Sequence, residues 1–367
     1  MKYSMNGGLF DYRTPLGKFK IGAFLPQLIW DSGELEGVKA ICSRIWKEVC
    51  MKSNNFDFMG LIRFDLVPNF IDPTSEKLGT LVVAGIYEIN THSPEEIAGI
   101  SALEYFTGLK TQDDPCEIFA KKLREIFGDS EISLVCGNNL LKREWGKIFL
   151  DKLKKMGLSI RRMTPAEVMN EEPKILFRWG DVRLDGPSQF DDNFTNWLVN
   201  QKKGAIFNTI PNGIDLGDKT HLLSSDDSEL GKIFGNNRAL LSEEDIWWSV
   251  ESDDYSNRHA GFLVKPNKGA SGNDICFGEN MMTTEWIEVL KTRLSQRGYS
   301  IWEAKWLPKI NINEESLAMD INPVFWATGN EIEYLYTIVR TDKYSRYVTE
   351  RTINVAQGAG LALHTIQ

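Results

Sequence analysis

The sequence predicts a mixed α/β protein of the α+β kind, in which an antiparallel core sheet accompanies a parallel β-α-β subdomain. Two apolar runs rich in β-branched and aromatic residues, 59–67 and 80–92, flank a loop of turn residues and predict a hairpin. Segment 131–167 has the pattern strand, amphipathic helix, strand, which is typical of parallel sheets. From residue 299 onward, apolar runs again alternate with turn signals, so this part is predicted to be rich in strands.

Helices are expected on both sides of the predicted hairpin. In segment 34–52 apolar residues recur at helical spacing, and segment 93–106 opens with a Ser-Pro-Glu-Glu cap signal. Further helices are expected to end near 203–204, to span the polar stretch 216–248 and to span 283–297. Further strands are expected in 205–210, on both sides of a glycine-rich loop within 261–278, and in 299–308, 316–327, 331–342 and 351–363.

Composition limits the classes of protein that this chain can belong to. Its 367 residues suffice for two or three structural units, and a net charge of −9 without a basic stripe disfavours nucleic-acid binding. Five cysteines without a CxxC pair and four scattered histidines indicate neither a disulfide framework nor a zinc site. No secretion signal is expected in residues 1–20, and the apolar runs are too short to span a membrane. A cytoplasmic protein is therefore expected, and its oligomeric state stays open.

Two short polar strings lie inside the hairpin strands. Arg63 and Asp65 are two residues apart, as are Glu88 and Asn90, and residues at that spacing share one face of a strand. If the strands pair, one cation, two carboxylates and an amide meet, and such oxygen ligands suit Mg²⁺. The alternative is the ordinary polar alternation of half-exposed strands.

A second motif begins at the end of the apolar run 262–264. Lys265 is followed by Pro266 and by a loop with two glycines, Gly269 and Gly272. Glycines let backbone N–H groups approach an anion closely, and a lysine adds a point charge for phosphate. The loop is not a Walker A motif, since G-x-x-x-x-G-K-[ST] is absent. The alternative is a hairpin loop with surface lysines.

The order of these parts resembles that of the circularly permuted ATP-grasp ligases, in particular the glutathionylspermidine synthase family with its synthetase-only relatives. The string R-x-D, then E-x-N-T-x-x-P-E, a β-α-β unit, a lysine before a helix and K-P-x-x-G all occur here, with a longer spacing between the first two. The resemblance implies a permuted ATP-grasp fold. It divides the chain into core strands for metal (1–128), a substrate-side β-α-β subdomain (129–212), a nucleotide-binding lobe (213–300), and a hinge with the return to the core (301–367).

The resemblance also implies roles for single residues. Asp65, Glu88 and Asn90 would hold Mg²⁺ on ATP, while Arg63 would neutralise the transferring phosphoryl group. Segment 301–308 resembles the hinge beside the adenine, where Glu303 would contact the amino group or the ribose. The remaining implied ATP contacts are Lys219, Lys265 and the loop residues Gly269, Ala270, Ser271 and Gly272.

Two departures from the family pattern leave alternatives open. The family has an arginine just after an A-G-x-G-like stretch, but Gly358–Ala362 lacks one; Arg340 is preferred over Arg351 as its catalytic replacement. A rival metal string, Asp320 with Asn322, lies on the predicted strand 316–327. Glu88 is preferred to Asp320 because Arg63 and Asp65 lie just upstream, while no second carboxylate is expected near Asp320.

The reaction implied by the resemblance is ATP-dependent ligation of a carboxylate to an amine through an acyl phosphate, releasing ADP. The expected partners are therefore a small-molecule acid and a small-molecule amine, with ATP and Mg²⁺ as cofactors. One alternative is an amino-acid or peptide ligase that uses no polyamine. Another is a catalytically silent nucleotide-binding protein on the same scaffold. The family's amidase half has no counterpart in this sequence, so no amidase activity is expected.

Overall fold

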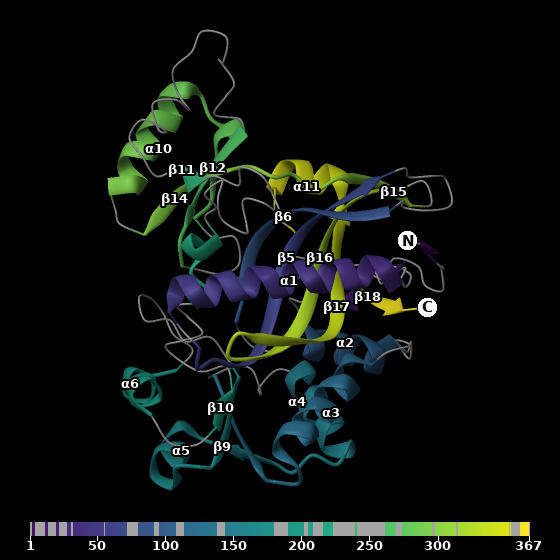
Figure 1. Cartoon of the computed structure of the whole chain (residues 1–367), viewed down its shortest axis with the longest axis vertical. Coiled ribbons are helices and arrows are strands. Elements are labelled where there is room, and N and C mark those ends of the chain that lie inside the picture. The colour runs from purple at the N-terminus through teal and green to yellow at the C-terminus, as the bar shows by residue number, and fades with distance from the viewer. Residues whose placement is uncertain are drawn as a thin grey trace.

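A computed structural model provides the structure of the protein, which rises in three tiers along its longest axis (Figure 1). A small lobe with α10 lies at one end, the large sheet lies in the middle, and a parallel sheet with its helices lies at the other end. The residues that the structure describes are 2–3, 12–13, 20–21, 28–30, 32–54, 56–71, 80–91, 95–107, 114–137, 144–179, 190–201, 205–207, 216–222, 239–240, 261–268, 274–295, 298–312, 315–351, 353 and 360–366.

Within the described residues, the core sheet has eight strands in the order β1-β4-β18-β17-β16-β5-β6, with β15 pairing beside β16. All neighbours are antiparallel except β4 and β18, so the predicted antiparallel core is confirmed. The strands are β1 (Lys2–Tyr3), β4 (Leu28–Trp30), β5 (Met59–Ile71), β6 (Thr80–Asn90), β15 (Lys309–Ile312), β16 (Glu315–Thr328), β17 (Glu331–Lys343) and β18 (Gly360–Ile366); a separate ribbon pairs β2 (Tyr12–Arg13) with β3 (Lys20–Ile21).

The predicted hairpin is confirmed as β5 paired with β6. Its first strand is longer than predicted, because residues 68–71 continue β5 instead of starting the loop. Pro68 lies in this extension, and the pairing shifts register between Val67 and Pro68. A proline can occupy a strand at such an irregularity because no regular ladder hydrogen bond is lost there.

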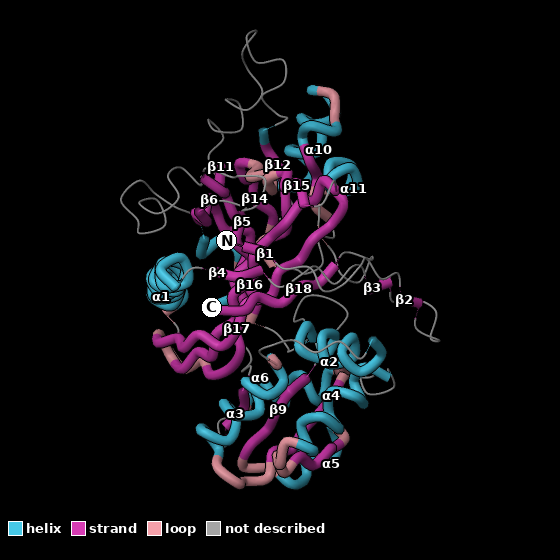
Figure 2. The backbone as a smooth tube through the Cα atoms, turned by 90° about the vertical axis from the view of Figure 1, so that its right-hand side faces the viewer, coloured by secondary structure: helices cyan, strands magenta, loops and turns pink. Residues whose placement is uncertain are grey.

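Helix α1 (Ser32–Ser53) crosses one face of the core sheet, and the other helices of this region lie on the opposite side (Figure 2). Its apolar stripe, which includes Ile45 and Trp46, packs on residues of the sheet such as Phe64 and Phe325. The opposite face packs against α2 (Glu95–Thr107), α3 (Pro115–Phe127) and α4 (Glu144–Lys155). The sheet therefore has two apolar faces, and the helices predicted at 34–52 and 93–106 are both present.

The parallel sheet has the order β10-β9-β7-β8 and confirms the predicted β-α-β unit. Three of its elements were not predicted. Strand β9 is buried along its whole length, so it shows no polar–apolar alternation; α3 and α5 each carry a capping residue and a proline at the first turn, a signal that was available. The elements are β7 (Ile132–Cys136), β8 (Ile160–Met163), β9 (Ile175–Trp179), β10 (Ala205–Phe207), α5 (Pro165–Glu171) and α6 (Asp192–Asn200).

The small lobe consists of the sheet β11-β14-β12-β13 and helix α10, which packs on it. The predicted strand, loop, strand unit is present as β12 and β13. The predicted helix over 216–248 is wrong at Ala239–Leu240, which form β11 because they pair with the distant strand β14. The elements are the 3₁₀ helix η2 (Lys219–Leu222), β11, β12 (Phe262–Pro266), β13 (Cys276–Phe277), the 3₁₀ helix η5 (Gly278–Asn280), α10 (Thr283–Ser295) and β14 (Tyr299–Glu303).

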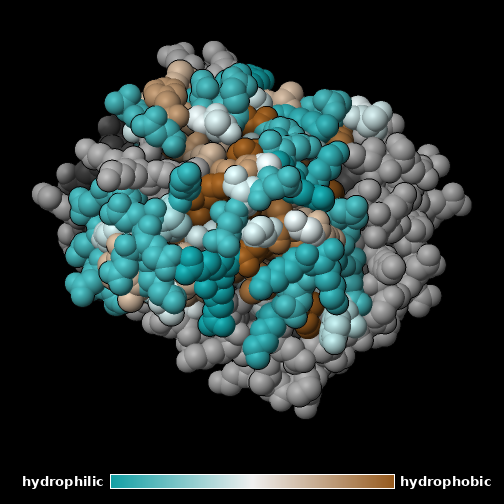
Figure 3. Space-filling view, turned by 90° about the horizontal axis from the view of Figure 1, so that it is seen from below, coloured by the Kyte–Doolittle hydropathy of each residue, from teal (hydrophilic) through white to brown (hydrophobic). Residues whose placement is uncertain are grey.

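The chain returns from the small lobe to the core through residues 304–308, which join β14 to β15. The predicted strand-rich C-terminal part is confirmed in β14 to β17, and the short helix α11 (Tyr344–Glu350) follows β17. The strand predicted over 351–363 is wrong at Arg351 and Ile353, which lie outside any strand, and the observed strand β18 begins at Gly360. In the view from below, hydrophilic side chains cover much of the described surface, with hydrophobic ones between them (Figure 3). None of the described helices combines the length and apolarity that a membrane crossing needs. The division into four domains stays a prediction.

Candidate functional site

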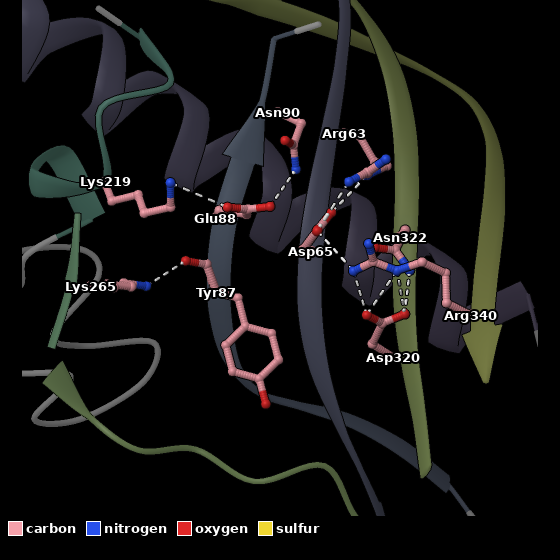
Figure 4. Close-up of polar contacts among 10 residues, drawn as sticks. All are labelled: Arg63, Asp65, Tyr87, Glu88, Asn90, Lys219, Lys265, Asp320, Asn322 and Arg340. Atoms are coloured by element: carbon pink, nitrogen blue, oxygen red, sulfur yellow. Dashed lines mark hydrogen bonds and ion pairs between the residues drawn. The ribbon is translucent and has the colours of Figure 1, made fainter. Parts of the chain in front are cut away.

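A cluster of charged side chains lies on the face of the core sheet opposite α1 (Figure 4). Strand alternation places it there: Phe64 and Ile89 point into the core under α1, so Arg63, Asp65 and Glu88 point to the other face. In the hairpin register Asp65 is opposite Glu88, and Arg63 is opposite Asn90. The sequence prediction that the two polar strings meet is confirmed.

Asp65 is held by two arginines. Its carboxylate accepts hydrogen bonds from Nε of Arg63 at 2.7 Å and from Nη2 of Arg63 at 3.1 Å. Nη2 of Arg340, on β17, donates to the same carboxylate at 2.9 Å. The carboxylate is only 2% exposed, and burial strengthens such charge-assisted bonds. The preferred arginine, Arg340, therefore does reach the cluster.

The rival string on β16 belongs to the same cluster. Arg340 donates from Nε to both oxygens of Asp320, at 3.1 and 3.0 Å, and Nδ2 of Asn322 donates to Oδ1 of Asp320 at 2.6 Å. Arg340 thus bridges Asp320 and Asp65, and the expectation that Asp320 has no second carboxylate nearby is wrong. The cause is sheet order: β16 lies between β5 and β17, a non-local pairing. Burial raises the pKa of Asp320, although Arg340 opposes this.

Glu88 has a different environment, at the side of the cluster nearest the small lobe. Oε2 of Glu88 lies 3.3 Å from Nζ of Lys219, and Nδ2 of Asn90 donates to Oε1 at 3.1 Å. Burial alone would raise the pKa of Glu88, but the charges of Lys219 and Arg63 and the Asn90 hydrogen bond outweigh it. The pKa is lowered to about 2, so Glu88 is a stable anion at neutral pH.

Lys265 extends from β12 to the neighbouring residue of β6. Its Nζ donates to the backbone oxygen of Tyr87 at 3.0 Å and lies 3.8 Å from the ring centroid of Trp302, a cation–π distance. Burial and the nearby charge of Lys219 lower the pKa of Lys265 to about 7, against the opposing effect of Glu88. Two lysines of the small-lobe side therefore converge on residues 87–88 of the core sheet.

Other predicted residues are not brought into the cluster. The loop residues Gly269, Ala270, Ser271 and Gly272 lie outside the described residues, as does the side chain of Glu303, whose backbone belongs to β14. Arg351 forms an ion pair with Glu279 of η5 and lies 4.5 Å from the ring centroid of Trp306, so it is bound elsewhere.

Tyr87 was missed because nothing in a strand pattern marks a backbone carbonyl as an acceptor.

The oxygen-bearing side chains of the cluster are of the types that Mg²⁺ binds. Asp65 and Glu88 are cross-strand neighbours, and Asn90, whose Nδ2 donates to Glu88, carries an amide oxygen as a further donor group. Across the described residues, no three acidic, histidine or cysteine side chains form a complete metal-binding group. Mg²⁺ is commonly held by one or two carboxylates with phosphates and water in the other positions. An incomplete oxygen shell on the protein is compatible with that mode of binding.

Comparison with known proteins places the fold. No family model matches the chain, and no curated protein matches it in sequence. The structure is similar to that of a glutathione synthetase-like effector from Globodera pallida in its apo form, with a TM-score of 0.51 and 12% identity over 95% of this chain and 92% of that chain. A candidate gamma-glutamylcysteine synthetase from Methylobacillus flagellatus matches 87% of this chain and 85% of its own with a TM-score of only 0.35 and 11% identity. The first comparison shows an α+β fold like that of the effector.

Proposed function

We propose that the protein is an ATP-dependent carboxylate–amine ligase that resembles the glutathionylspermidine synthetases. The observation that carries the proposal is the convergence of Lys219 and Lys265 on the β6 residues next to Arg63 and Arg340. Four cations gathered around Asp65 and residues 87–88 suit a polyphosphate and the charge that develops during phosphoryl transfer. The effector's name, glutathione synthetase-like, and the shared fold are consistent with a synthetase.

The proposed reaction has two steps. A carboxylate oxygen of the acid attacks the γ-phosphorus of ATP, and the bond to ADP breaks. The amine nitrogen then attacks the carbonyl carbon of the acyl phosphate, phosphate leaves, and the nitrogen loses a proton. Neither step needs a covalent protein nucleophile, since phosphoryl transfer depends on positioning and charge neutralisation.

The charged residues are assigned roles by their environments. Lys265 and Lys219 would hold the phosphates on the small-lobe side of the cluster. Arg63 and Arg340, which Asp65 holds side by side, would neutralise charge on the transferring group. The guanidinium of Arg340 stays charged at any working pH, because the carboxylates of Asp320 and Asp65 overcome the effect of burial and raise its pKa.

The metal is assigned to the hairpin strands. We propose that Glu88 and Asn90 would hold Mg²⁺ together with Asp65. When bound, Mg²⁺ would polarise phosphate oxygens and neutralise part of their charge. Glu88 suits the role because its low pKa keeps it deprotonated, and because its side chain, at 23% exposure, is more accessible than that of Asp65.

The test is ADP release from Mg-ATP with panels of acids and amines. Glutathione, amino acids and short peptides serve as acids, with polyamines and amino acids as amines. ADP release that requires one acid and one amine together, and yields an amide by mass spectrometry, supports the proposal. Arg63→Met should abolish it, whereas Arg161→Met, which removes an exposed pair with Glu171 on the parallel unit, should not. Absence of ATP binding in calorimetry would refute the proposal.

A further inference from the structure

We propose that Tyr87 is a positioning residue that holds the small lobe in register with the core sheet, so that the two lysines stay over β6. This inference rests on the proposed function. It starts from the segment 304–308, through which the chain leaves the lobe. On the lobe side, the backbone N–H of Ala304 donates to the backbone oxygen of Gly261 at 2.7 Å. On the core side, tyrosine hydroxyls form hydrogen bonds with the segment 304–308.

Two tyrosine hydroxyls form hydrogen bonds with the backbone of this segment. The hydroxyl of Tyr87 donates to the backbone oxygen of Lys305 at 2.5 Å, and the backbone N–H of Leu307 donates to the hydroxyl of Tyr347, on α11, at 2.9 Å. Both bonds therefore hold the backbone of the segment that leaves the lobe, one at a carbonyl and one at an N–H group.

Tyr87 also acts at the other end of the lobe contact. Its backbone oxygen accepts the bond from Lys265, and the next residue, Glu88, pairs with Lys219. One residue thus fixes both the exit of the lobe and the lysine of β12. If the hydroxyl is removed, the carbonyl of Lys305 loses this partner, and the lobe can shift relative to β6. The spacing between the lysines and Glu88 then changes while the groups themselves remain.

The test uses Tyr87→Phe, which keeps the ring and the backbone oxygen and removes only the hydroxyl. Tyr347→Phe removes the second hydroxyl, which accepts from the backbone N–H of Leu307 in the same segment. Tyr299→Phe is the matched control, because it loses a hydroxyl bond to Arg293 within the lobe. Binding of ATP, ADP and adenosine, each with Mg²⁺, is measured by isothermal titration calorimetry. Each variant is first compared with the wild type by circular dichroism.

Misplaced lysines should weaken the binding of a ligand more, the more phosphates that ligand carries. We expect ATP affinity to fall about tenfold in Tyr87→Phe, the scale of one lost hydrogen bond, and adenosine affinity to change less than about twofold. Tyr347→Phe should also weaken ATP binding more than adenosine binding. If Tyr87→Phe alters the circular dichroism spectrum, the affinities of Tyr347→Phe test the proposal in its place. Tyr299→Phe should bind all three ligands like the wild type.

The failures are distinguishable. Wild-type ATP affinity in Tyr87→Phe, or an equal loss for ATP and adenosine, would overturn the positioning role and leave the ligase proposal standing. Failure of the wild type itself to bind ATP would overturn both. A loss in Tyr299→Phe as large as that in Tyr87→Phe would also overturn the role, since any lost hydroxyl would then have the same effect.

Discussion

Two acid-x-Asn strings lie on the same face of the core sheet, Glu88 with Asn90 on β6 and Asp320 with Asn322 on β16. In both, the amide nitrogen of asparagine donates to its acid, at 3.1 and 2.6 Å. Their neighbours differ: β6 ends the described sheet order and faces lysines, whereas β16 is interior and Asp320 pairs with Arg340. The pKa of Glu88 is lowered and that of Asp320 is raised. The acid-x-Asn string fixes how the acid and the amide lie relative to each other, and the neighbouring charges determine the pKa of the acid and the role proposed for it.

The largest expected effect is that of Glu88→Gln on turnover. Removing the anion that faces the lysines should reduce ADP release from Mg-ATP by about 10²–10³-fold, the usual range for one electrostatic group in a transition state. Steady-state ADP release measures it, with Glu171→Gln, an exposed pair on the parallel unit, as control. Unchanged turnover in Glu88→Gln would transfer the metal role to Asp320.

The next largest effect is expected for Lys219→Met, which should shift the pKa of Glu88 upward, the direction in which that of Asp320 is shifted. Without that charge, burial is less opposed, so the pKa of Glu88 should rise from about 2 towards or above its ordinary value. In the wild type, the stability that Glu88 contributes is present above its unfolded pKa and is lost as pH falls through about 2; in the variant this contribution shrinks and vanishes once the pKa reaches its unfolded value. Carboxyl carbon NMR titration measures the shift. A pKa that stays near 2 would show that Lys219 does not control Glu88.

Asp320→Asn should act on stability. It places an amide against the buried guanidinium of Arg340, and breaking one side of a buried pair is costly, so we expect a loss of about 2–3 kcal/mol in the free energy of unfolding. Urea unfolding measures this. Glu171→Gln, which breaks an exposed pair with Arg161, should lose less than about 1 kcal/mol. Equal losses of unfolding free energy in the two variants would contradict the structural role of Asp320.

The smallest effect concerns pH and Lys265. A lysine with a pKa of about 7 loses its charge as pH rises from 6 to 8, so wild-type ATP affinity should fall by up to about tenfold over that range. Lys265→Arg keeps its charge and should show only the pH dependence of ATP itself. Calorimetry at several pH values measures both proteins. Parallel pH profiles would show that Lys265 does not contact the phosphates.

Much of this arrangement could be predicted from sequence, because strand alternation is a local signal. The pairing of Arg63 and Asp65 with Glu88 and Asn90 follows from two strands and one short loop. Lys265 could be found because a strand, Lys-Pro and a glycine-rich loop lie together in the chain. These predictions depend on residues close in sequence, whose pairing has few alternatives.

The rest depends on contacts between distant segments. The neighbourhood of Asp320 depends on β16 lying between β5 and β17, and no local pattern gives that order. Strand β11 exists only through its pairing with β14, so a polar stretch was predicted as helix. The role proposed for Tyr87 rests on a hydroxyl and a backbone carbonyl that contact residues more than 170 positions away.

The central claim is that Glu88, and not Asp320, holds the metal that accompanies ATP. Mn²⁺ in place of Mg²⁺ tests it directly, because the electron paramagnetic resonance spectrum of Mn-ATP changes when the complex passes from solution to the protein. The account predicts that folded Asp320→Asn binds Mn-ATP like the wild type, whereas Glu88→Gln binds it far more weakly. Retained binding in Glu88→Gln together with loss in Asp320→Asn would contradict it.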